Sequence, residues 1–577
     1  MSTRGALRIG NCSGFLGDRL AAMREMLEGG PLDVLTGDYL AELTMLILFR
    51  SMAKDPTKGY ATTFLRQLED CLGLASERGV RIVVNAGGLN PAGCADAVRA
   101  LAERLGLRVA VASVAGSVAR ERLGELDPGT VTVDPYLGCW GVVEALSAGA
   151  GVVVTGRTTD AALVCGPAAW HHGWARDDWD PLAGAVVAGH ILECGAQATG
   201  GNYAFFSEVP RLDRVGFPLA EIAPDGSSVI TKHPGTGGLV SVGTVTAQLL
   251  YEIEGPAYLG PDVVARFDTI RLSDDGRDRV RVTGVRGAPP PATVKVSTNR
   301  LGGFRNSITF VLCGLDIPAK AEVAKAAMAP ALDGVRDVAW QLVRLDQPDA
   351  PSEEQASALL RCHVKDADAD RVGRRFSAAA VELALASYPG FTLTSPPAEA
   401  MPYGVYRPVF VDAGAVAHTV TRPDGRQVRI EATRPGTGPS TPGPATGSPG
   451  AATPPRATAG GPPPAVARVP LGRLAGARSG DKGGTANLGV WARSEAAYAW
   501  LVGYLTVDRL VDLLPEALGL RVCRYELPNL RALNFTLDGL LGQGVAASTR
   551  FDPQAKALGE WLRSRLVDVP AALLASG

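Results

Sequence analysis

The stretch VRIVVNAGGLNP, residues 80–91, joins a run of β-branched apolar residues to a loop rich in Gly and Asn. Helical spacing of apolar residues follows over Asp96–Leu105. Short apolar runs that alternate with helical patterns indicate βαβ units and a parallel sheet. The same alternation on either side of this stretch predicts further strands at Ala6–Gly10, Leu32–Leu35, Val109–Ala112 and Gly151–Val154. We therefore predict a parallel α/β part over about residues 1–204.

After about residue 205 the pattern changes to short β-rich segments separated by Gly, Pro and Asp. The predicted strands are Ser228–Thr231, Leu239–Val242, Thr269–Leu272, Val280–Thr283 and Thr293–Ser297. Helical patterns return over Pro318–Leu345 and Arg374–Ser387. These segments predict a mixed part over about 205–433, which completes an α/β body of residues 1–433.

Residues 434–466 consist almost entirely of Pro, Gly, Ala, Ser and Thr. Such a stretch buries too little apolar surface to offset its ordering entropy, so we predict a linker. The remaining residues, 467–577, show a strand, a long helix, two strands and a last helix. They are Thr485–Ala492, Ala496–Leu514, Leu520–Leu527, Ala532–Leu537 and Gln554–Val567. This order is typical of a small α+β domain of ferredoxin-like type, and the linker would let it dock in cis or in trans.

Composition excludes several classes of function. The chain has 577 residues and a net charge of −2, so it has no basic excess to hold nucleic acid or an anionic membrane. No run approaches 18 apolar residues, and the first residues lack the apolar core of a signal peptide. The nine cysteines form no CxxC pair. We therefore expect a cytoplasmic protein with reduced thiols.

Four loops follow predicted strands: NCSGFLGD (11–18), TGDYLAE (36–42), NAGGLNP (85–91) and TGRTTD (155–160). Ligands bind beyond the carboxyl ends of strands in open α/β sheets, so we predict a site there. The residues we expect to bind substrate are Asn85, Gly87, Gly88, Asn90 and Arg157, with Asp160 as an acid–base or hydroxyl-binding group. The alternative is that these residues only form turns. No dinucleotide fingerprint or P-loop occurs.

The segment GHILECGAQATGGN, residues 189–202, is the densest cluster of reactive side chains. His190, Glu193 and Cys194 have i, i+3 and i+4 spacing and share one face of a helix. His190 or Glu193 suits acid–base catalysis, and Cys194 suits nucleophilic attack if its pKa is lowered. The alternative is a packed helix with a satisfied histidine. His and Cys resemble half a zinc site, but no second pair follows, so we expect no metal.

Two further Gly-rich segments carry cations suited to an anion. Lys232 begins KHPGTGG (232–238), and Arg478 and Lys482 lie in ARSGDKGGTAN (477–487). Arg, Lys and backbone amides bind carboxylate or phosphate, so we expect the second segment to close over the cleft as a basic loop. A plain turn is the alternative for both segments. In RYELPNLRALNF (524–535), Asn529 and Asn534 lie among apolar residues and need polar partners, which the body would provide.

Several of these motifs together resemble the acyclic terpene utilisation protein A family. NCSGFLGDR, GDYLAELT, NAGGLNP, GRTTDAALV, GHILECGAQATGGN and TKHPGTGGLVS resemble its body, and ARSGDKGGTANLGV, RYELPNLRALNF and LLGQGV resemble its ferredoxin-like C-terminal domain. The resemblance implies a role in the degradation of acyclic terpenoids and branched acids. It implies a branched acyl-CoA or a related carboxylic acid as substrate, but no particular reaction or catalytic residue.

We therefore expect a lyase that hydrates, dehydrates or cleaves a branched β-hydroxy acyl thioester or acid. This chemistry needs an acid–base group beside the reacting carbon and donors for an enolate-like oxygen. One alternative is acyl transfer or thioester hydrolysis through Cys194. Another is a non-catalytic subunit or scaffold of an acyl-CoA complex. We expect no cofactor, CoA only as part of the substrate, and a homo-oligomer.

Overall fold

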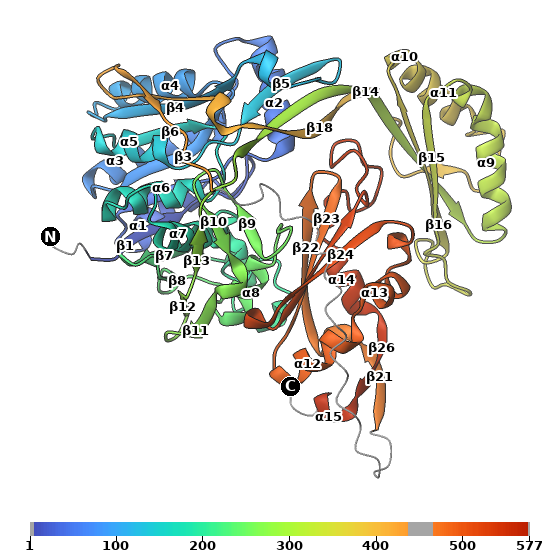
Figure 1. Ribbon diagram of the computed structural model, residues 1–577. Coiled ribbons are helices and arrows are strands. Elements are labelled where there is room, and N and C mark those ends of the chain that lie inside the picture. The colour runs from blue at the N-terminus through green and yellow to red at the C-terminus, as the bar shows by residue number, and fades with distance from the viewer. Residues whose placement is uncertain (1–4, 437–464, 575–577) are drawn as a thin grey trace.

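The computed structural model describes residues 5–436 and 465–574. Most of the predicted linker, residues 437–464, lies outside the described residues. The fold is mixed α/β, which confirms the predicted class, and it is built from a large central sheet and two smaller lobes (Figure 1). No helix in the described ranges is both long enough and apolar enough to cross a membrane.

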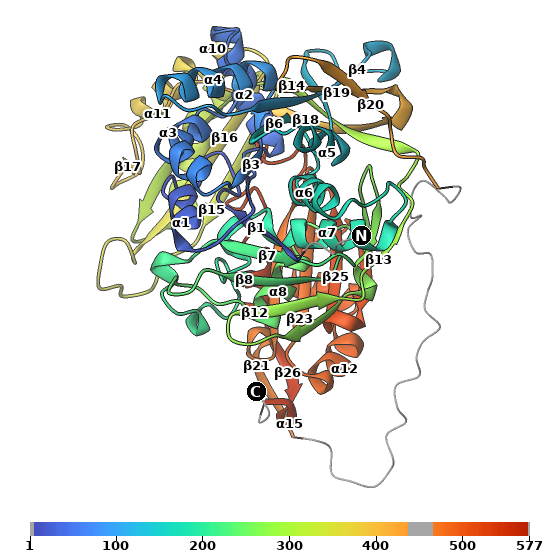
Figure 2. The same ribbon diagram turned by 90° about the vertical axis from the view of Figure 1, so that its left-hand side faces the viewer.

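Five parallel strands form the centre of an 11-stranded sheet. In spatial order they are β1 (Leu7–Asn11), β2 (Val34–Gly37), β3 (Arg81–Gly88), β6 (Val152–Gly156) and β4 (Val111–Val118). Antiparallel strands extend both edges: β7 (Pro218–Ile222), β8 (Ser228–Lys232), β12 (Arg279–Thr283) and β11 (Arg271–Asp274) beyond β1, and β19 (Val416–Thr421) and β20 (Gln427–Ile430) beyond β4. Figure 2 shows β1, β7, β8 and β12 in succession. The predicted strands near 6, 32, 80, 109 and 151 are therefore confirmed.

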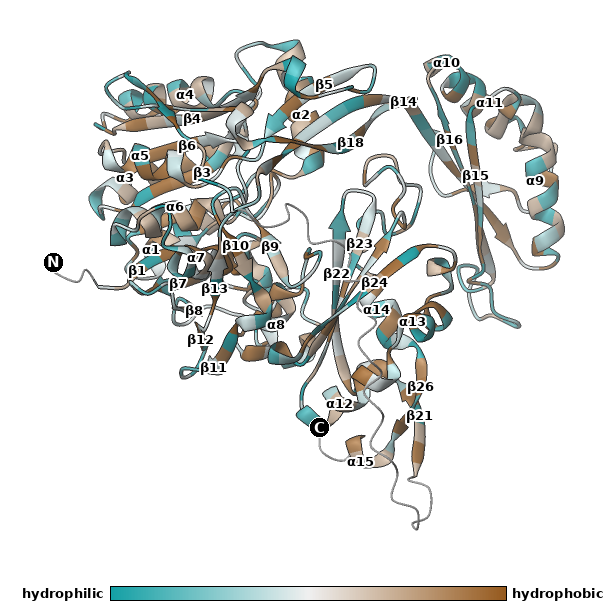
Figure 3. Ribbon diagram, viewed as in Figure 1, coloured by the Kyte–Doolittle hydropathy of each residue, from teal (hydrophilic) through white to brown (hydrophobic). Residues whose placement is uncertain are grey.

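Helices cover both faces of this sheet and form two separate cores. One core includes α1 (Ala22–Gly29), α3 (Thr62–Glu77) and α4 (Pro91–Arg104), and the other includes α5 (Trp140–Ser147), α6 (Ala162–His172) and α7 (Trp179–Leu192). Every residue of α7 from Leu182 to Leu192 is buried, which an all-round apolar helix requires. A small sheet of β9 (Ala257–Leu259), β10 (Val264–Arg266) and β13 (Arg286–Ala288) covers α7. Hydrophobic residues gather where the helices face the sheet (Figure 3).

A second lobe stands beside the central sheet and is joined to it by long strands (Figure 1). Its elements are β14 (Thr293–Cys313), α9 (Ile317–Leu332), β15 (Asp337–Val343), β16 (Ser357–Asp366), α10 (Ala369–Val372), α11 (Arg374–Glu382), β17 (Thr392–Leu393) and β18 (Met401–Asp412). The order β15-β16-β14-β17 with helices after β14 and β16 is a ferredoxin-like βαββαβ layout. The first half of β14 also pairs with β5 (Thr130–Pro135).

The sequence predicted that residues 205–433 form one mixed part. The structure instead divides them between the central sheet and the second lobe. β7, β8, β11, β12, β19 and β20 extend the central sheet, while β14 to β18 form the second lobe. The alternating patterns of these strands predict their type but not their partners, because a short amphipathic strand fits any open sheet edge.

The C-terminal domain is a four-stranded antiparallel sheet covered by helices. Its strands are β22 (Ala475–Lys482), β23 (Thr485–Ala492), β25 (Ala532–Asp538) and β24 (Arg521–Leu527), in that spatial order. Its helices are α12 (Glu495–Tyr504), α13 (Val507–Leu513) and α14 (Leu558–Ser564), and β21 (Val466–Pro470) pairs with β26 (Leu566–Pro570). Asn529 donates hydrogen bonds to the Phe267 and Ile270 carbonyls of the body, and Asn534 to the Ile253 carbonyl. These contacts confirm the expected partners of both amides.

Five predicted elements are wrong. The single helix predicted over Ala496–Leu514 is two helices, α12 and α13, which are separated at Leu505 and Thr506. Leu239–Val242 is not a strand, because Ser241 caps helix α8 (Val242–Leu249). The helix predicted over Pro318–Leu345 ends at Leu332, and the chain continues as β15, where Val338 and Trp340 pack against the core of the lobe. The segment 477–487 is a β-hairpin of β22 and β23 rather than a loop. The last predicted helix is shorter, because β26 begins at Leu566.

Candidate functional site

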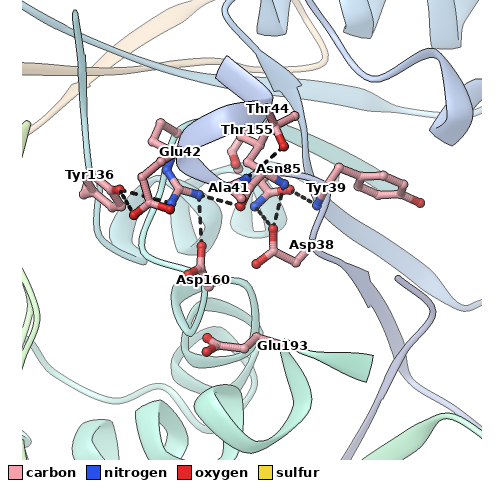
Figure 4. A network of polar contacts seen from close by, with 12 residues as sticks. Asp38, Tyr39, Ala41, Glu42, Thr44, Asn85, Tyr136, Thr155, Asp160 and Glu193 are labelled. Carbon is pink, nitrogen blue, oxygen red and sulfur yellow. Dashed lines mark hydrogen bonds and ion pairs between the residues drawn. The ribbon is translucent and has the colours of Figure 1, made fainter. Parts of the chain in front are cut away.

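The carboxyl ends of the parallel strands carry a buried polar network, drawn in Figure 4. Asn85, within β3, donates from Nδ2 to Asp38 Oδ1 at 2.6 Å and accepts from the Tyr39 amide at 2.7 Å. Asp38 directly follows β2, and the Leu40 amide donates to its Oδ1 at 2.9 Å. Burial, and then the nearby Asp160, raise the pKa of Asp38 well above its usual range. The network thus joins two of the predicted strand-end loops.

Arg157, directly after β6, is the cation at the centre of this network, and its side chain is only 3% exposed. Its Nη1 donates to the Leu40 carbonyl at 3.0 Å and to Asp160 Oδ1 at 3.1 Å. Its Nη2 donates to Tyr136 Oη at 3.2 Å, and the guanidinium lies 4.4 Å from the centroid of that ring. Burial lowers the pKa of Arg157, but Tyr136 and Asp160 raise it by more, so the guanidinium stays charged.

Glu42, the first residue of α2 (Glu42–Lys54), extends the network toward the second lobe. Tyr136 donates from Oη to Glu42 Oε1 at 3.3 Å. Burial raises the pKa of Glu42, but Lys295 of β14 and Arg157 lower it by more, so the result lies below the usual range. Glu42 is therefore held as a carboxylate beside two cations.

Glu193 directly follows α7 and lies beneath Asp160 in Figure 4, and His190 lies in the last turn of α7. His190 Nδ1 is 3.1 Å from Glu193 Oε1, yet neither ring nitrogen has a hydrogen-bond partner among the described residues. The ring packs between Tyr258 and Phe267, with centroid distances of 5.0 and 5.5 Å. Burial lowers the pKa of His190 to about 4. Burial and the Asp160 carboxylate raise the pKa of Glu193 well above its usual range, so both groups favour their neutral forms.

The β22–β23 hairpin of the C-terminal domain faces this network. Lys482 lies among Glu252, Glu42 and Glu193; burial lowers the pKa of Lys482, but these carboxyl groups raise it by more. Burial raises the pKa of the adjacent Asp481 to about 8, and Glu252 adds to that effect. The site is thus built from the body and the C-terminal domain together.

A small pocket with a cavity volume of about 40 Å³, partly open to solvent, lies between these parts of the molecule. Its walls come from α2, from the paired strands β14 and β18, from the β22–β23 turn and from the segment before α14. The lining residues are Ala41, Glu42, Leu43, Leu46, Asn299, Gly404, Tyr406, Asp481, Gly483, Gln543, Gly544, Val545, Ala546 and Gln554. Carboxyl groups from two domains therefore border one space with apolar walls.

Cys194 follows Glu193 but lacks the environment of a nucleophile. Burial raises the pKa of its thiol well above the usual range, and the Glu193 and Glu252 carboxyl groups raise it further. A catalytic thiolate needs a positive environment instead. The side chain is therefore held as a neutral thiol.

Several predicted binding residues have structural partners. Asn90 caps α4, accepting from the Gly93 amide at 2.9 Å and donating to the Lys58 carbonyl at 3.0 Å. Gly87 lies against the Thr155 carbonyl of β6, and Gly88, with a φ of 50°, lies against Leu48 of α2, so both positions have no room for a side chain. This packing accounts for these three residues without a ligand.

One of the predicted cations is also occupied: Lys232 donates to the Thr236 carbonyl at 2.9 Å and lies 3.3 Å from Asp278. The Arg478 guanidinium lies 4.4 Å from the centroid of the Tyr251 ring, and its Nη2 is buried without a hydrogen-bond partner among the described residues. Of the predicted basic residues, Arg157 and Lys482 lie in the network. Over residues 5–436 and 465–574, no group of His, Cys, Asp and Glu has a geometry that suits a metal ion.

Sequence reasoning missed Asp38, Glu42, Tyr136 and Lys295. Asp38 and Glu42 lie within the strand-end loop TGDYLAE, so their position there was the available signal. Tyr136 and Lys295 reach the site through β5 and β14, which pair across about 160 residues of sequence. Nothing local in the sequence indicates that pairing.

Comparisons with known proteins agree with this architecture. No curated protein and no solved structure matches the chain. The model of the AtuA ferredoxin-like domain matches residues 469–568. The model described as acyclic terpene utilisation family protein AtuA matches residues 7–422, which is most of the body. Because that match spans well over half of its 577 residues, the chain belongs to the AtuA family of acyclic terpene utilisation proteins.

Proposed function

We propose that this member of an acyclic terpene utilisation family is a lyase that adds or removes water at a branched β-hydroxy acyl group. One feature carries the proposal: Glu42, near Lys295 and Arg157, and Glu193, buried near Asp160, lie in environments that displace their pKa values in opposite directions. The pKa of Glu42 lies below its usual range, whereas that of Glu193 lies well above it. Such a separation is how active sites assign one carboxyl as base and the other as acid.

The reaction needs these two roles. In dehydration, the Glu42 carboxylate takes the proton from the carbon next to the acyl carbonyl. The electrons of that C–H bond form the C=C bond, and the bond from the β-carbon to its hydroxyl oxygen breaks. The protonated Glu193 gives its proton to the departing hydroxyl, which leaves as water. Hydration is the reverse, with the protons returned to the same two groups.

The cations have a separate task. Negative charge develops on the acyl oxygen as the proton leaves, and donors fixed before the reaction stabilise that charge without reorganising. Arg157 is held in place by Leu40, Asp160 and Tyr136. Lys482 adds a second positive charge from the C-terminal domain. We assign charge stabilisation to these two side chains.

The pocket supports a branched aliphatic substrate. Leu43, Leu46, Val545 and Ala546 line it beside Glu42. Apolar walls with few polar groups are typical of small-molecule sites. We propose a branched carboxylic acid or its CoA thioester, with CoA as part of the substrate and no other cofactor. Acyl transfer through Cys194 has less support, because the thiol is held neutral.

The proposal is tested by incubating the protein with branched 3-hydroxy acids and their CoA thioesters in water enriched in ¹⁸O. Mass spectrometry should detect the unsaturated product and ¹⁸O in the recovered hydroxyl. Removing either carboxyl, as Glu42→Gln or Glu193→Gln, should lower kcat by about 10²- to 10⁴-fold. Glu28→Gln, which changes an exposed ion pair with Arg24, should leave kcat unchanged.

The pH profile separates the two roles. Glu42 must be ionised and Glu193 protonated, so kcat/KM should fall at both acidic and alkaline pH. Glu42→Gln should remove the acidic limb from the residual activity, and Glu193→Gln the alkaline limb. Turnover that is unchanged in both variants, or a product formed by cleavage of a carbon–carbon bond, would contradict this assignment.

A further inference from the structure

Two lysine ammonium groups beside the pocket lie over aromatic rings. Lys295 Nζ is 4.9 Å from the centroid of Tyr136 and 5.6 Å from that of Tyr406. Lys482 Nζ is 6.0 Å from the centroid of Tyr258. Within the described ranges, neither ammonium has a hydrogen bond or an ion pair. A ring face attracts a cation but fills none of its hydrogen-bond positions, so both groups keep donors for another molecule.

Tyr406 brings these two lysines to one place. Lys295 lies over its ring, and Gly483, the neighbour of Lys482, packs against the same ring. Gly483 has a φ of 65°, and a Cβ there would lie 3.3 Å from Tyr406 Cε1. Glycine is therefore required for the turn to approach the ring. Tyr406, which lines the pocket, is thus contacted from the body and from the C-terminal domain, and both lysines lie close enough to Glu42 of the same lining to lower its pKa.

The N-terminus of α2 adds positive potential to the same pocket. Ala41, Glu42 and Leu43 line it, and Ala41, at the N-cap position, has no side chain that could accept from the first amides. Those amides and the helix dipole favour a negative group close by. Here the helix end only supports a site that the two lysines define.

Three cations lie near Glu42. Arg157 is paired with Asp160, whereas Lys295 and Lys482 both lower the pKa of Glu42. Asp481 and Glu252 lie close by, but their raised pKa values favour the neutral acids. Glu254 also lies near Lys482. An anion placed near the two lysines would be attracted by both.

We propose that Lys295 and Lys482, together with the start of α2, form an anion-binding subsite that holds a carboxylate of the substrate across the interface between the body and the C-terminal domain. A carboxylate fits better than a phosphate dianion, because the Glu42 carboxylate borders the same pocket and repels additional negative charge. The inference rests on the proposed function only in calling the bound acid a substrate. It favours a substrate with a free carboxylate over a thioester that has none.

Calorimetric titration of the full-length protein tests the subsite without turnover. The probes are 3-hydroxy-3-methylbutyrate and geranate, the neutral amide of each acid, and inorganic phosphate. We expect the acids to bind more tightly than their amides and than phosphate. Lys482→Gln and Lys295→Gln should each weaken acid binding on the order of tenfold to a hundredfold, as loss of a charged hydrogen bond does. Lys482→Arg, which keeps the charge, should retain most of the affinity.

Lys325→Gln is the matched control, because Lys325 pairs with Glu322 on the second lobe and is remote from the pocket lining; its affinity should not change. The proposal is overturned if neither acid binds the wild-type protein, if acid and amide bind equally, or if both Gln variants bind as the wild type does. Phosphate binding tighter than both acids would overturn the assignment to carboxylate. Acid binding that depends on both lysines, without any dehydration, would refute the proposed lyase and leave this subsite standing.

Discussion

The loops after β3 and β6 lie side by side at the carboxyl ends of two central strands. The polar side chain of the first loop has a structural role, whereas that of the second enters the candidate site. After β3, the Asn90 side chain caps α4 by accepting from the Gly93 amide, and it donates to the Lys58 carbonyl. After β6, Arg157 turns into the network and contacts Leu40, Asp160 and Tyr136. Asn85 is intermediate, because it lies within β3 but holds Asp38. A loop is therefore functional through the direction of its side chains, whatever its composition.

The largest effect should follow from replacing Arg157 with Leu. The change leaves Tyr136 and the Leu40 carbonyl without their cation inside the protein. Breaking a buried ion pair costs about 3–5 kcal/mol, so the free energy of unfolding in urea should fall by about 3 kcal/mol or more, and turnover should be lost. Arg99→Leu, which removes an exposed i,i+3 pair with Asp96, should cost at most about 1 kcal/mol. Equal losses in the free energy of unfolding of the two variants would contradict the expected difference between a buried and an exposed arginine.

A smaller effect should follow from Asn85→Ala. This change removes the donor to Asp38 and the acceptor for the Tyr39 amide. An unsatisfied buried polar group costs about 1–3 kcal/mol, so urea unfolding should register a loss of about that size. Substrate binding should weaken as well, since the loop after β2 also carries Glu42. A variant that loses stability but keeps its affinity for substrate would show that Asn85, like Asn90, has only a structural role.

The smallest effect should come from Asn90→Ala. Loss of an N-cap side chain costs about 1 kcal/mol, and the site itself is untouched. Thermal unfolding should therefore shift slightly to lower temperature while the affinity for acids stays the same. Asn90→Asp, which keeps an acceptor for the Gly93 amide, should restore most of the stability. A clear loss of affinity in Asn90→Ala would break the comparison and make the loop after β3 part of the site.

The sequence allowed the parallel strands and the place of the site to be predicted, because both depend on local patterns. Val80–Val84 and the loop after it carry their own signals of strand, turn and helix start. The same reasoning grouped Asn90 with Arg157, because it cannot tell a cap from a ligand when both are polar residues beside glycine. It also selected Lys232, whose ammonium is taken by Asp278 and Thr236.

The site residues that the sequence did not predict depend on contacts between distant segments. Lys295 reaches Glu42 only because β14 leaves the second lobe and pairs with β5. Lys482 reaches it only because the C-terminal domain docks with its hairpin toward the body. No periodicity encodes either arrangement. The strand at 337–343 was missed for a different reason: Val338, Trp340 and Leu342 alternate, but they follow a strong helical pattern, and Pro330 and Gly334 were not read as its end.

The pairing of β19 with β4 has a consequence for how the protein is made. β4 is complete once residue 118 is synthesised, but its partner begins only at residue 416. At typical rates of synthesis, the intervening residues, about 300, take roughly 15–60 s to emerge. During that time β4 presents an unpaired edge of a buried sheet, which is a template for aggregation. A nascent chain of this protein therefore has to be shielded on the ribosome until its last body strands arrive.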